Sequence, residues 1–377
     1  MRTKLSTLFA LTTAAALATT IESAALVAQS STVIPPSCAT RDGNRHMTVY
    51  FAENRVRRVQ VLIDARHLSG LSGSRLVRMS FRKDIKGADM YGRIRGNETT
   101  PMVVNASFTD AKADMPSAIF RDNHGSKVVE IFRGGLALPR VSPTDGRAVA
   151  TFASTEAPTF VFKQPLDIVA GKTLCLDFES FPASAGHEWE WPIDAETHRV
   201  AGTSRVIGSA CWNSKSTPVT TVMESSLRPG MHLKSTSRTP PNTAAAFLMY
   251  GLSDQFAFGT VPLPLTIAAP ACQLVVSPDV FVPAIFFHRL RASDEGHTSQ
   301  IVPTPQIAAM YGSTLYLQYL FLVSGATPSL ATGNGIAAKF TSDTPTLGVS
   351  LVATTNTTGS SGRVFLDFAP VIELESR

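Results

Sequence analysis

The sequence lacks the short motifs that identify a reaction. It contains no G-x-S-x-G nucleophile elbow, no H-E-x-x-H zinc motif, no phosphate-binding glycine loop and no calcium loop of the D-x-D-x-D-G kind. Its four cysteines include no C-x-x-C pair, so a thiolate zinc site is not expected. The sequence therefore gives no support to nucleophilic or zinc-dependent catalysis, and no cofactor or metal ion is predicted.

Charged residues are also scarce, at 17% of the chain, whereas 44% of the residues are hydrophobic. A disordered chain would lack this much apolar surface, so the composition favours a packed protein. Between Arg41 and Arg95, thirteen Lys or Arg stand against five Asp or Glu, an excess of eight positive charges. We expect this stretch to form a basic face. The ligand-binding candidates in it are Arg57, Arg58, Arg82 and Lys83.

Two interpretations of this basic stretch remain open. It contacts an anionic polysaccharide or an envelope protein, or its arginines only solvate the outward faces of strands. Nucleic acid is not expected as a partner, because the basic residues are mixed with strand-like apolar ones and no aromatic stacking motif accompanies them.

Residues 1–28 have the three-part build of a secretory signal peptide. Arg2 and Lys4 precede an apolar run, and small residues follow, with cleavage expected after Ala25 or Ala28. We therefore predict export to the periplasm, the outer surface or the extracellular medium. No transmembrane anchor is expected, because the leader run and the apolar segment Leu315–Leu322 are both too short to span a bilayer.

Apolar residues recur with a period of two, and turns containing Gly or Pro separate these runs. This pattern predicts an all-β fold of two tandem antiparallel β-sandwich or jelly-roll-like domains, residues 38–250 and 252–377. The last two expected strands form a hairpin. The expected strands are 56–63, 76–82, 102–108, 128–132, 148–152, 160–162, 173–179, 244–250, 272–277, 314–323, 336–340, 347–353 and 364–368.

The four cysteines all follow the leader. An even number of cysteines in an oxidising compartment predicts two disulfides, for which three pairings are possible. We favour Cys175 with Cys211, which would close a loop that stabilises by roughly 4 kcal/mol in the chain-entropy model. Cys38 would then pair with Cys272.

The densest group of chemically active side chains is segment 187–198, with four carboxylates and two histidines. If residues 188–191 are extended, the two glutamates share one face and the two tryptophans the other. Paired carboxylates beside aromatic rings are typical of glycoside hydrolases, and a divalent cation held by Asp194, Glu196 and a histidine is a further interpretation. The candidates are Glu188, Glu190, Asp194 and Glu196 for catalysis, and Trp189 and Trp191 for ligand binding.

A structural interpretation of the same segment competes with these. The tryptophans would then pack between sheets, and the carboxylates would face water or pair with arginines. The two views differ in geometry. A hydrolase needs two carboxyl groups about 5 to 10 Å apart in an open cleft, whereas a scaffold would splay them apart or bind them to arginines.

Short structural motifs run through both halves of the chain after the leader. Together they resemble a group of uncharacterised exported bacterial proteins with two β-sandwich halves. That group has no established activity, so the resemblance implies the fold and export alone. The motifs are Arg57–Leu62, Ser80–Asp84, Val161–Leu166, Leu174–Asp177, Trp191, Asp194–Ala195, Gly208, Cys211, Cys272–Leu274, Gly312, Leu315, Gln318 and Gly333–Gly335.

The sequence thus predicts an exported noncatalytic protein, a structural or binding element of the cell envelope or extracellular matrix that contacts anionic polysaccharide through its basic face. The alternative is a secreted carbohydrate-active enzyme that uses the carboxylates of segment 187–198. The sequence does not indicate an oligomeric state.

Overall fold

The computed structural model describes residues 30–47, 56–85, 98–139, 149–181, 191–198, 200–212, 218–268, 272–287, 296–325, 327 and 329–377. The named strands pair antiparallel in several sheets, which confirms the all-β prediction. Within these ranges no helix is long and apolar enough to cross a membrane. Short 3₁₀ helices accompany the strands: η1 (Pro36–Cys38), η2 (Ala65–Leu71), η3 (Phe120–Asn123), η4 (Glu224–Ser226) and η5 (Ala308–Met310).

One set of sheets combines strands from both ends of the described chain, and we call it the outer unit (residues 30–198 and 345–377). Its six-stranded sheet has the order β24-β23-β3-β8-β5-β6, and two smaller sheets have the orders β1-β26-β4-β7 and β2-β9-β25. The strands are β1 (Ser30–Ile34), β2 (Arg45–Met47), β3 (Arg57–Ile63), β4 (Arg75–Phe81), β5 (Glu98–Thr109), β6 (Val129–Leu138), β7 (Thr159–Asp167), β8 (Thr173–Ser180), β9 (Ile193–Thr197), β23 (Val349–Thr354), β24 (Arg363–Leu366), β25 (Phe368–Pro370) and β26 (Ile372–Ser376).

The strands between them pair among themselves, and we call this set the inserted unit (residues 200–344). Its larger sheets have the orders β10-β22-β21-β13-β18 and β11-β12-β20-β19, beside two short hairpins. The strands are β10 (Thr203–Ile207), β11 (Thr220–Val222), β12 (His232–Thr239), β13 (Thr243–Gly251), β14 (Phe256–Ala257), β15 (Val261–Pro262), β16 (Leu265–Ala268), β17 (Cys272–Leu274), β18 (Val280–Ala284), β19 (Phe286–Phe287), β20 (Gly296–Pro303), β21 (Thr314–Val323) and β22 (Ser329–Lys339).

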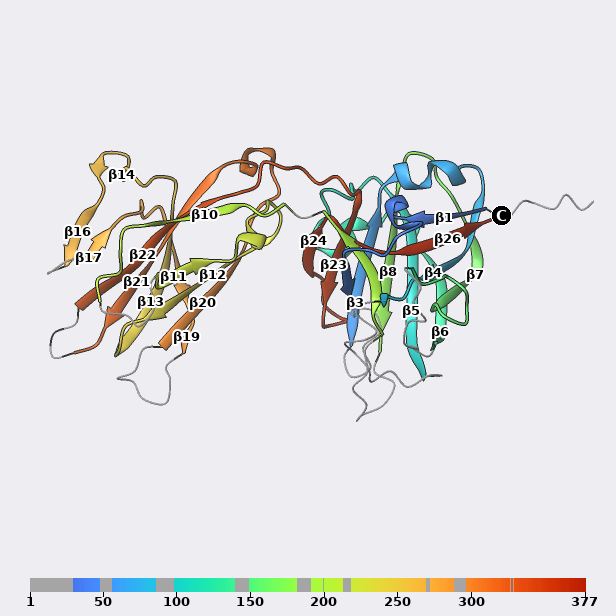
Figure 1. Cartoon of the computed structure of the whole chain (residues 1–377), viewed down its shortest axis with the longest axis horizontal. Coiled ribbons are helices and arrows are strands. Elements are labelled where there is room, and N and C mark those ends of the chain that lie inside the picture. Colours follow the sequence, from blue (N-terminus) through green and yellow to red (C-terminus); the bar gives the residue numbers. More distant parts are fainter. Residues whose placement is uncertain are drawn as a thin grey trace, which may run out of the picture.

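This division corrects the boundary expected near residue 251. Strand β13, at the end of the expected first domain, pairs with β18 and β21, whereas β23 of the expected second domain pairs with β3. Figure 1 shows the two units as separate bodies, with β23 and β24 beside β3. The alternation of a strand reveals which face is buried but does not identify its partner strand, so sequence order suggested the wrong grouping.

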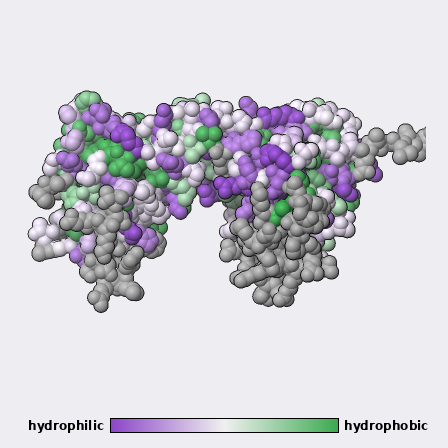
Figure 2. Space-filling view, viewed as in Figure 1, coloured by the Kyte–Doolittle hydropathy of each residue, from purple (hydrophilic) through white to green (hydrophobic). Residues whose placement is uncertain are grey.

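Each unit has its own apolar core. In the outer unit, side chains of the six-stranded sheet and of the β1-β26-β4-β7 sheet meet in one cluster. Within it, the rings of Phe81, Phe160 and Phe178 contact one another edge to face, with centroids 5.6 to 5.9 Å apart. A second cluster around Tyr319 and Phe321 fills the inserted unit. Figure 2 shows a mostly hydrophilic face on the outer unit and an apolar patch on the inserted one.

The expected hairpin is confirmed, because β23 and β24 pair with Leu351 opposite Phe365. The strand expected at 148–152 is not formed in its described residues, 149–152. They run instead into a turn in which the Glu156 amide donates to the Ala153 carbonyl oxygen. Short apolar alternation therefore predicted one strand too many at a turn.

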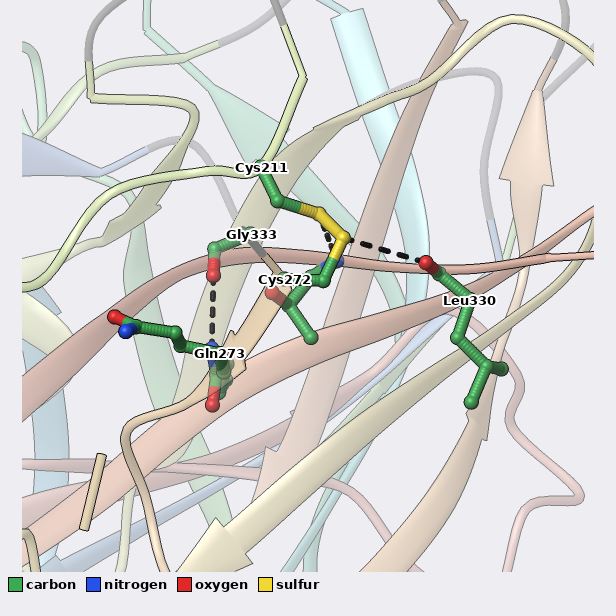
Figure 3. The surroundings of a disulfide bond; sticks show 7 residues. Cys211, Cys272, Gln273, Leu330 and Gly333 are labelled. Carbon is green, nitrogen blue, oxygen red and sulfur yellow. Dashed lines mark hydrogen bonds between the residues drawn. A yellow bond between two sulfur atoms is a disulfide. The ribbon is translucent and has the colours of Figure 1, made fainter. Parts of the chain in front are cut away.

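The favoured disulfide pairing is wrong. The structure joins Cys211 to Cys272, whose Cα atoms are 4.8 Å apart, and leaves Cys38 and Cys175 as buried free thiols in the outer unit. The bridge packs against β22, where Cys272 Sγ lies 3.3 Å from the Leu330 carbonyl oxygen (Figure 3). Loop length alone could not give this pairing, because it depends on which unit each cysteine joins.

A buried ion pair connects the two units. Arg228 of the inserted unit places Nη2 3.2 Å from Oδ2 of Asp367 in the outer unit. The Asp367 carboxylate also accepts the backbone amides of Thr346 and Leu347, and Arg228 Nη1 donates to the His198 carbonyl oxygen. Both segments by which the chain passes between the units are thus held at this ion pair.

Candidate functional site

Asp194, a candidate catalytic carboxylate, is enclosed in the outer unit. It lies on β9, and its Oδ2 accepts two hydrogen bonds from Arg82, at 2.5 and 2.8 Å, while Oδ1 accepts the Gly43 amide. Arg82 also donates to the carbonyl oxygens of Cys38 and Arg41. Burial raises the pKa of Asp194 to about 7, and the Arg82 guanidinium acts in the opposite direction.

Glu196, two residues further along β9, is bound in the same way. Arg41 donates to both of its oxygens, at 2.8 and 3.1 Å, and the Asn44 amide and the His198 ring lie at 3.2 Å. Burial would raise the pKa of Glu196, but the hydrogen bonds and charge of Arg41 outweigh it and the pKa is lowered. The neighbouring Cys38 thiol has its pKa raised to about 11, first by burial and then by Glu196.

The structure places Asp194, Glu196 and Trp191 in the interior of the outer unit. Trp191 is fully buried in the outer core, and its Nε1 donates to the Pro139 carbonyl oxygen at 3.1 Å. Candidates Glu188, Trp189 and Glu190 lie outside the described residues. The three described candidates match the structural interpretation of this segment, in which a tryptophan packs in the core and the carboxylates pair with arginines.

Arg82 and Lys83 are corrected as ligand-binding candidates. Both are buried, Arg82 completely, so neither can contact a polysaccharide at the surface. They follow β4 where the chain approaches β9: Lys83 forms a bridge with Ile193, and Arg82 pairs with Asp194. The carboxylate partner is 112 residues away in the sequence, so a local count of charges could not reveal it.

Arg58 is likewise committed within the fold. It donates from Nε and Nη2 to the two oxygens of Asp177, at 3.1 and 2.8 Å, and its guanidinium lies 4.5 Å from the centroid of the Phe120 ring. Other arginines of the basic stretch also pair with carboxylates, from the buried Arg82 to the exposed Arg75, which neutralises part of the charge of the stretch. The further pairs are Arg41–Glu196, Arg75–Asp167, Arg78–Glu375 and Arg82–Asp194.

Ser107, His124 and Asp177 form a hydrogen-bonded row that the sequence did not suggest. His124 Nδ1 lies 2.8 Å from Ser107 Oγ, and Nε2 lies 2.8 Å from Asp177 Oδ2. An ionised carboxylate only accepts, so Nε2 donates to Asp177, and in the neutral imidazole Nδ1 then accepts from the serine hydroxyl. Serine hydrolases use the same three residue types. No spacing signals the row, because its members come from β5, the end of η3 and β8.

Further contacts enclose this row. Ser107 is 1% exposed and its Oγ accepts the Gly125 amide, while Asp177 also accepts from Arg58 and Gln60. A catalytic nucleophile has to reach its substrate, which the buried Ser107 hydroxyl cannot do here. The row instead holds residues 110–125 against the six-stranded sheet.

Beside this row lies a groove of about 920 Å³ with charges of both signs. Two of its cations pair with its own carboxylates: Arg75 with Asp167 at 2.9 Å, and Lys172 with Asp110. The lining thus has no strong preference for an ion of one sign. The charged residues that line it are Arg75, Lys127 and Lys172, and Asp110, Asp122 and Asp167.

A second groove, which we call the basic groove, has a volume of about 570 Å³ and differs in charge. It lies between the units, because His232 begins β12 of the inserted unit and the other lining residues belong to the outer unit. Its lining contains arginines and a histidine but no carboxylate among the described residues. The lining residues are Arg57, His232, Ala353, Thr354, Thr355, Ser361, Gly362, Arg363 and Phe365.

Within the described ranges, no group of three or more His, Cys, Asp or Glu side chains is placed to hold a metal ion. No family model, curated protein or solved structure matches the chain. The resemblance to exported bacterial proteins therefore stays a prediction.

Proposed function

We propose that the chain is an exported noncatalytic binding protein of the cell envelope or extracellular matrix, with anionic polysaccharide as its partner. The observation that carries the proposal is the enclosure of Asp194 and Glu196 by donors from Arg82, Arg41, Gly43 and Asn44. A glycosidase needs its carboxyl groups free to act on a bound sugar. These two carboxylates hold the outer unit together.

Two features support export. The leader-like residues 1–28 have the composition of a signal peptide. The Cys211–Cys272 disulfide fits an oxidising compartment, where such bonds form and persist. The supporting feature for an anionic partner is the basic groove, whose lining contains two arginines and a histidine but no carboxylate among the described residues.

The test is to incubate the processed protein with a panel of neutral and anionic envelope polysaccharides and to measure both retention and new reducing ends. We expect retention on anionic polymers that salt abolishes, with no cleavage. New reducing ends that disappear in the Glu190→Gln variant would overturn the proposal and establish the carbohydrate-active enzyme.

A further inference from the structure

The basic groove contains a guanidinium that no carboxylate among its described lining residues neutralises. Arg363 is exposed on the edge strand β24 and has no ion pair with any described residue. Its guanidinium lies 5.0 Å from the centroid of the Phe365 ring, which restricts its position without neutralising its charge. Arg57 lines the same groove from the start of β3. The described lining residues of the groove therefore include positive charges and no carboxylate.

The groove also offers donors that the fold does not use. His232 Nδ1 is buried and has no hydrogen-bond partner in the described part of the chain. An unpaired buried nitrogen is costly, and a ligand oxygen could satisfy it. The hydroxyls of Thr354, Thr355 and Ser361 likewise make no hydrogen bond with described residues, so the groove combines positive charge with several free polar groups.

We propose that the basic groove binds the oxyanion groups, carboxylate or sulfate, of an anionic polysaccharide. This inference rests on the proposed function and assigns its site. Arg363 and Arg57 bind the anion by charge-assisted hydrogen bonds, His232 donates to it from Nδ1, and the hydroxyls bind neighbouring sugar oxygens. The groove volume is within the range of small-ligand sites and accommodates a short segment of the chain.

His232 gives this proposal a specific signature. In the unliganded protein the pKa of His232 is lowered, first by burial and then by the charge of Arg363. A bound anion offsets that charge and favours the protonated imidazole, so it raises the pKa. Among the described residues, Arg363 is the charged group that lowers the pKa of His232. Arg57 is the other cation in the lining of the groove.

The test compares binding of a polyuronate, a sulfated polysaccharide and neutral dextran to the full-length processed protein and its variants. We expect Arg363→Gln and Arg57→Gln each to weaken binding of the charged polymers by about tenfold, and Arg363→Lys to restore part of it. The control is Arg121→Gln, since Arg121 is 89% exposed on η3 and pairs only with adjacent Asp122 among the described residues. Circular dichroism establishes that each variant folds.

The His232 ring resonance, followed by NMR as polymer or sodium sulfate is added, separates the outcomes. A raised His232 pKa in the wild type but not in Arg363→Gln supports the inference. If the polymers bind but neither arginine variant differs from Arg121→Gln, the groove is not the site and the proposed function stands. If sulfate alone acts on His232 and no polymer binds, the anion site stands and the polysaccharide function fails. If no anion changes the His232 resonance, the inference is overturned.

Discussion

At the scale of single residues, the Arg82–Asp194 pair shows what charged groups do in this protein. Its side chains are 1% and 0% exposed, so neither ion is solvated by water. Removing the carboxylate leaves a buried guanidinium without its counterion. We expect Asp194→Ala to lower the free energy of unfolding by about 3–5 kcal/mol, measured by urea denaturation.

The matched control for this prediction is Asp167→Ala. It removes the Arg75–Asp167 pair, whose side chains are 56% and 73% exposed. Water screens such a pair, so the free energy of unfolding should change by less than about 1 kcal/mol. Equal losses in the two variants would contradict a structural role for Asp194.

Asp177 predicts how stability depends on acid pH. Burial would raise its pKa, but hydrogen bonds from His124, Arg58 and Gln60 outweigh burial and the pKa is lowered from 3.8. A carboxyl group of this kind stabilises the fold above its unfolded pKa, and the contribution is lost as pH falls through the folded pKa. We expect stability to fall below about pH 4, and Asp177→Asn to flatten that fall in urea titrations across pH.

The comparison for this titration is Asp110→Asn, because Asp110 is 88% exposed in its side chain. It should leave the slope of stability against pH close to that of the wild type. A wild-type slope in Asp177→Asn would show that other groups govern acid unfolding.

The structural roles of some residues could be predicted from the sequence, but the residues they pair with could not. A tryptophan in the core and carboxylates bound to arginines were one of the two interpretations of segment 187–198, and Trp191, Asp194 and Glu196 fit it. The sequence could not show that Arg82 turns inward, because its counterion lies on β9. It also gave no sign of the Ser107–His124–Asp177 row, whose members meet only after β5 and β8 pair.

At the scale of elements, many strands could be predicted from the pattern of apolar residues. These recur every second position in β3, β4, β5 and β8, and they form nearly continuous runs in β13 and β21. The pairing of strands far apart in the sequence could not be predicted in this way. The apolar pattern of β3 shows which of its side chains are buried, but it would be the same whichever strands lay along its two edges, here β8 and β23. The expected β23–β24 hairpin was accessible because the two strands follow one another in the chain, separated only by residues 355–362, which are rich in turn-forming residues.

The Cys211–Cys272 bridge joins the segment that follows β10 to β17 within the inserted unit, and this gives a prediction for its stability. Its two cysteines are 61 residues apart, and in the chain-entropy model the cross-link restricts the unfolded chain. We expect the double variant Cys211→Ser, Cys272→Ser to lose about 2–4 kcal/mol of unfolding free energy in urea.

Thiol counting checks the same assignment without a variant. When the protein is unfolded without reduction, two thiols per chain, those of Cys38 and Cys175, should react with a colorimetric thiol reagent. In the folded protein the same two thiols should react slowly, because both are buried. No free thiol in the unfolded chain would contradict the single described bridge.

At the scale of the whole molecule, the Arg228–Asp367 pair couples two bodies that have separate cores. Its side chains are at most 3% exposed, so removing the arginine leaves Asp367 without its buried cation. We expect Arg228→Ala to destabilise the protein by about 3 kcal/mol and to split one calorimetric unfolding transition into two. The control Arg205→Ala removes a pair with Asp254 at 66% arginine exposure and should keep a single transition.

The placement of β23 beside β3 also determines the order in which the molecule can be completed. A ribosome makes β3 first and then the entire inserted unit before β23 is available to cover the open side of β3. During that interval the nascent chain presents an exposed strand edge, which is prone to intermolecular pairing. A chain that folded during its synthesis would be open to such pairing, whereas the export proposed above, if it precedes folding, makes β23 available when β3 folds.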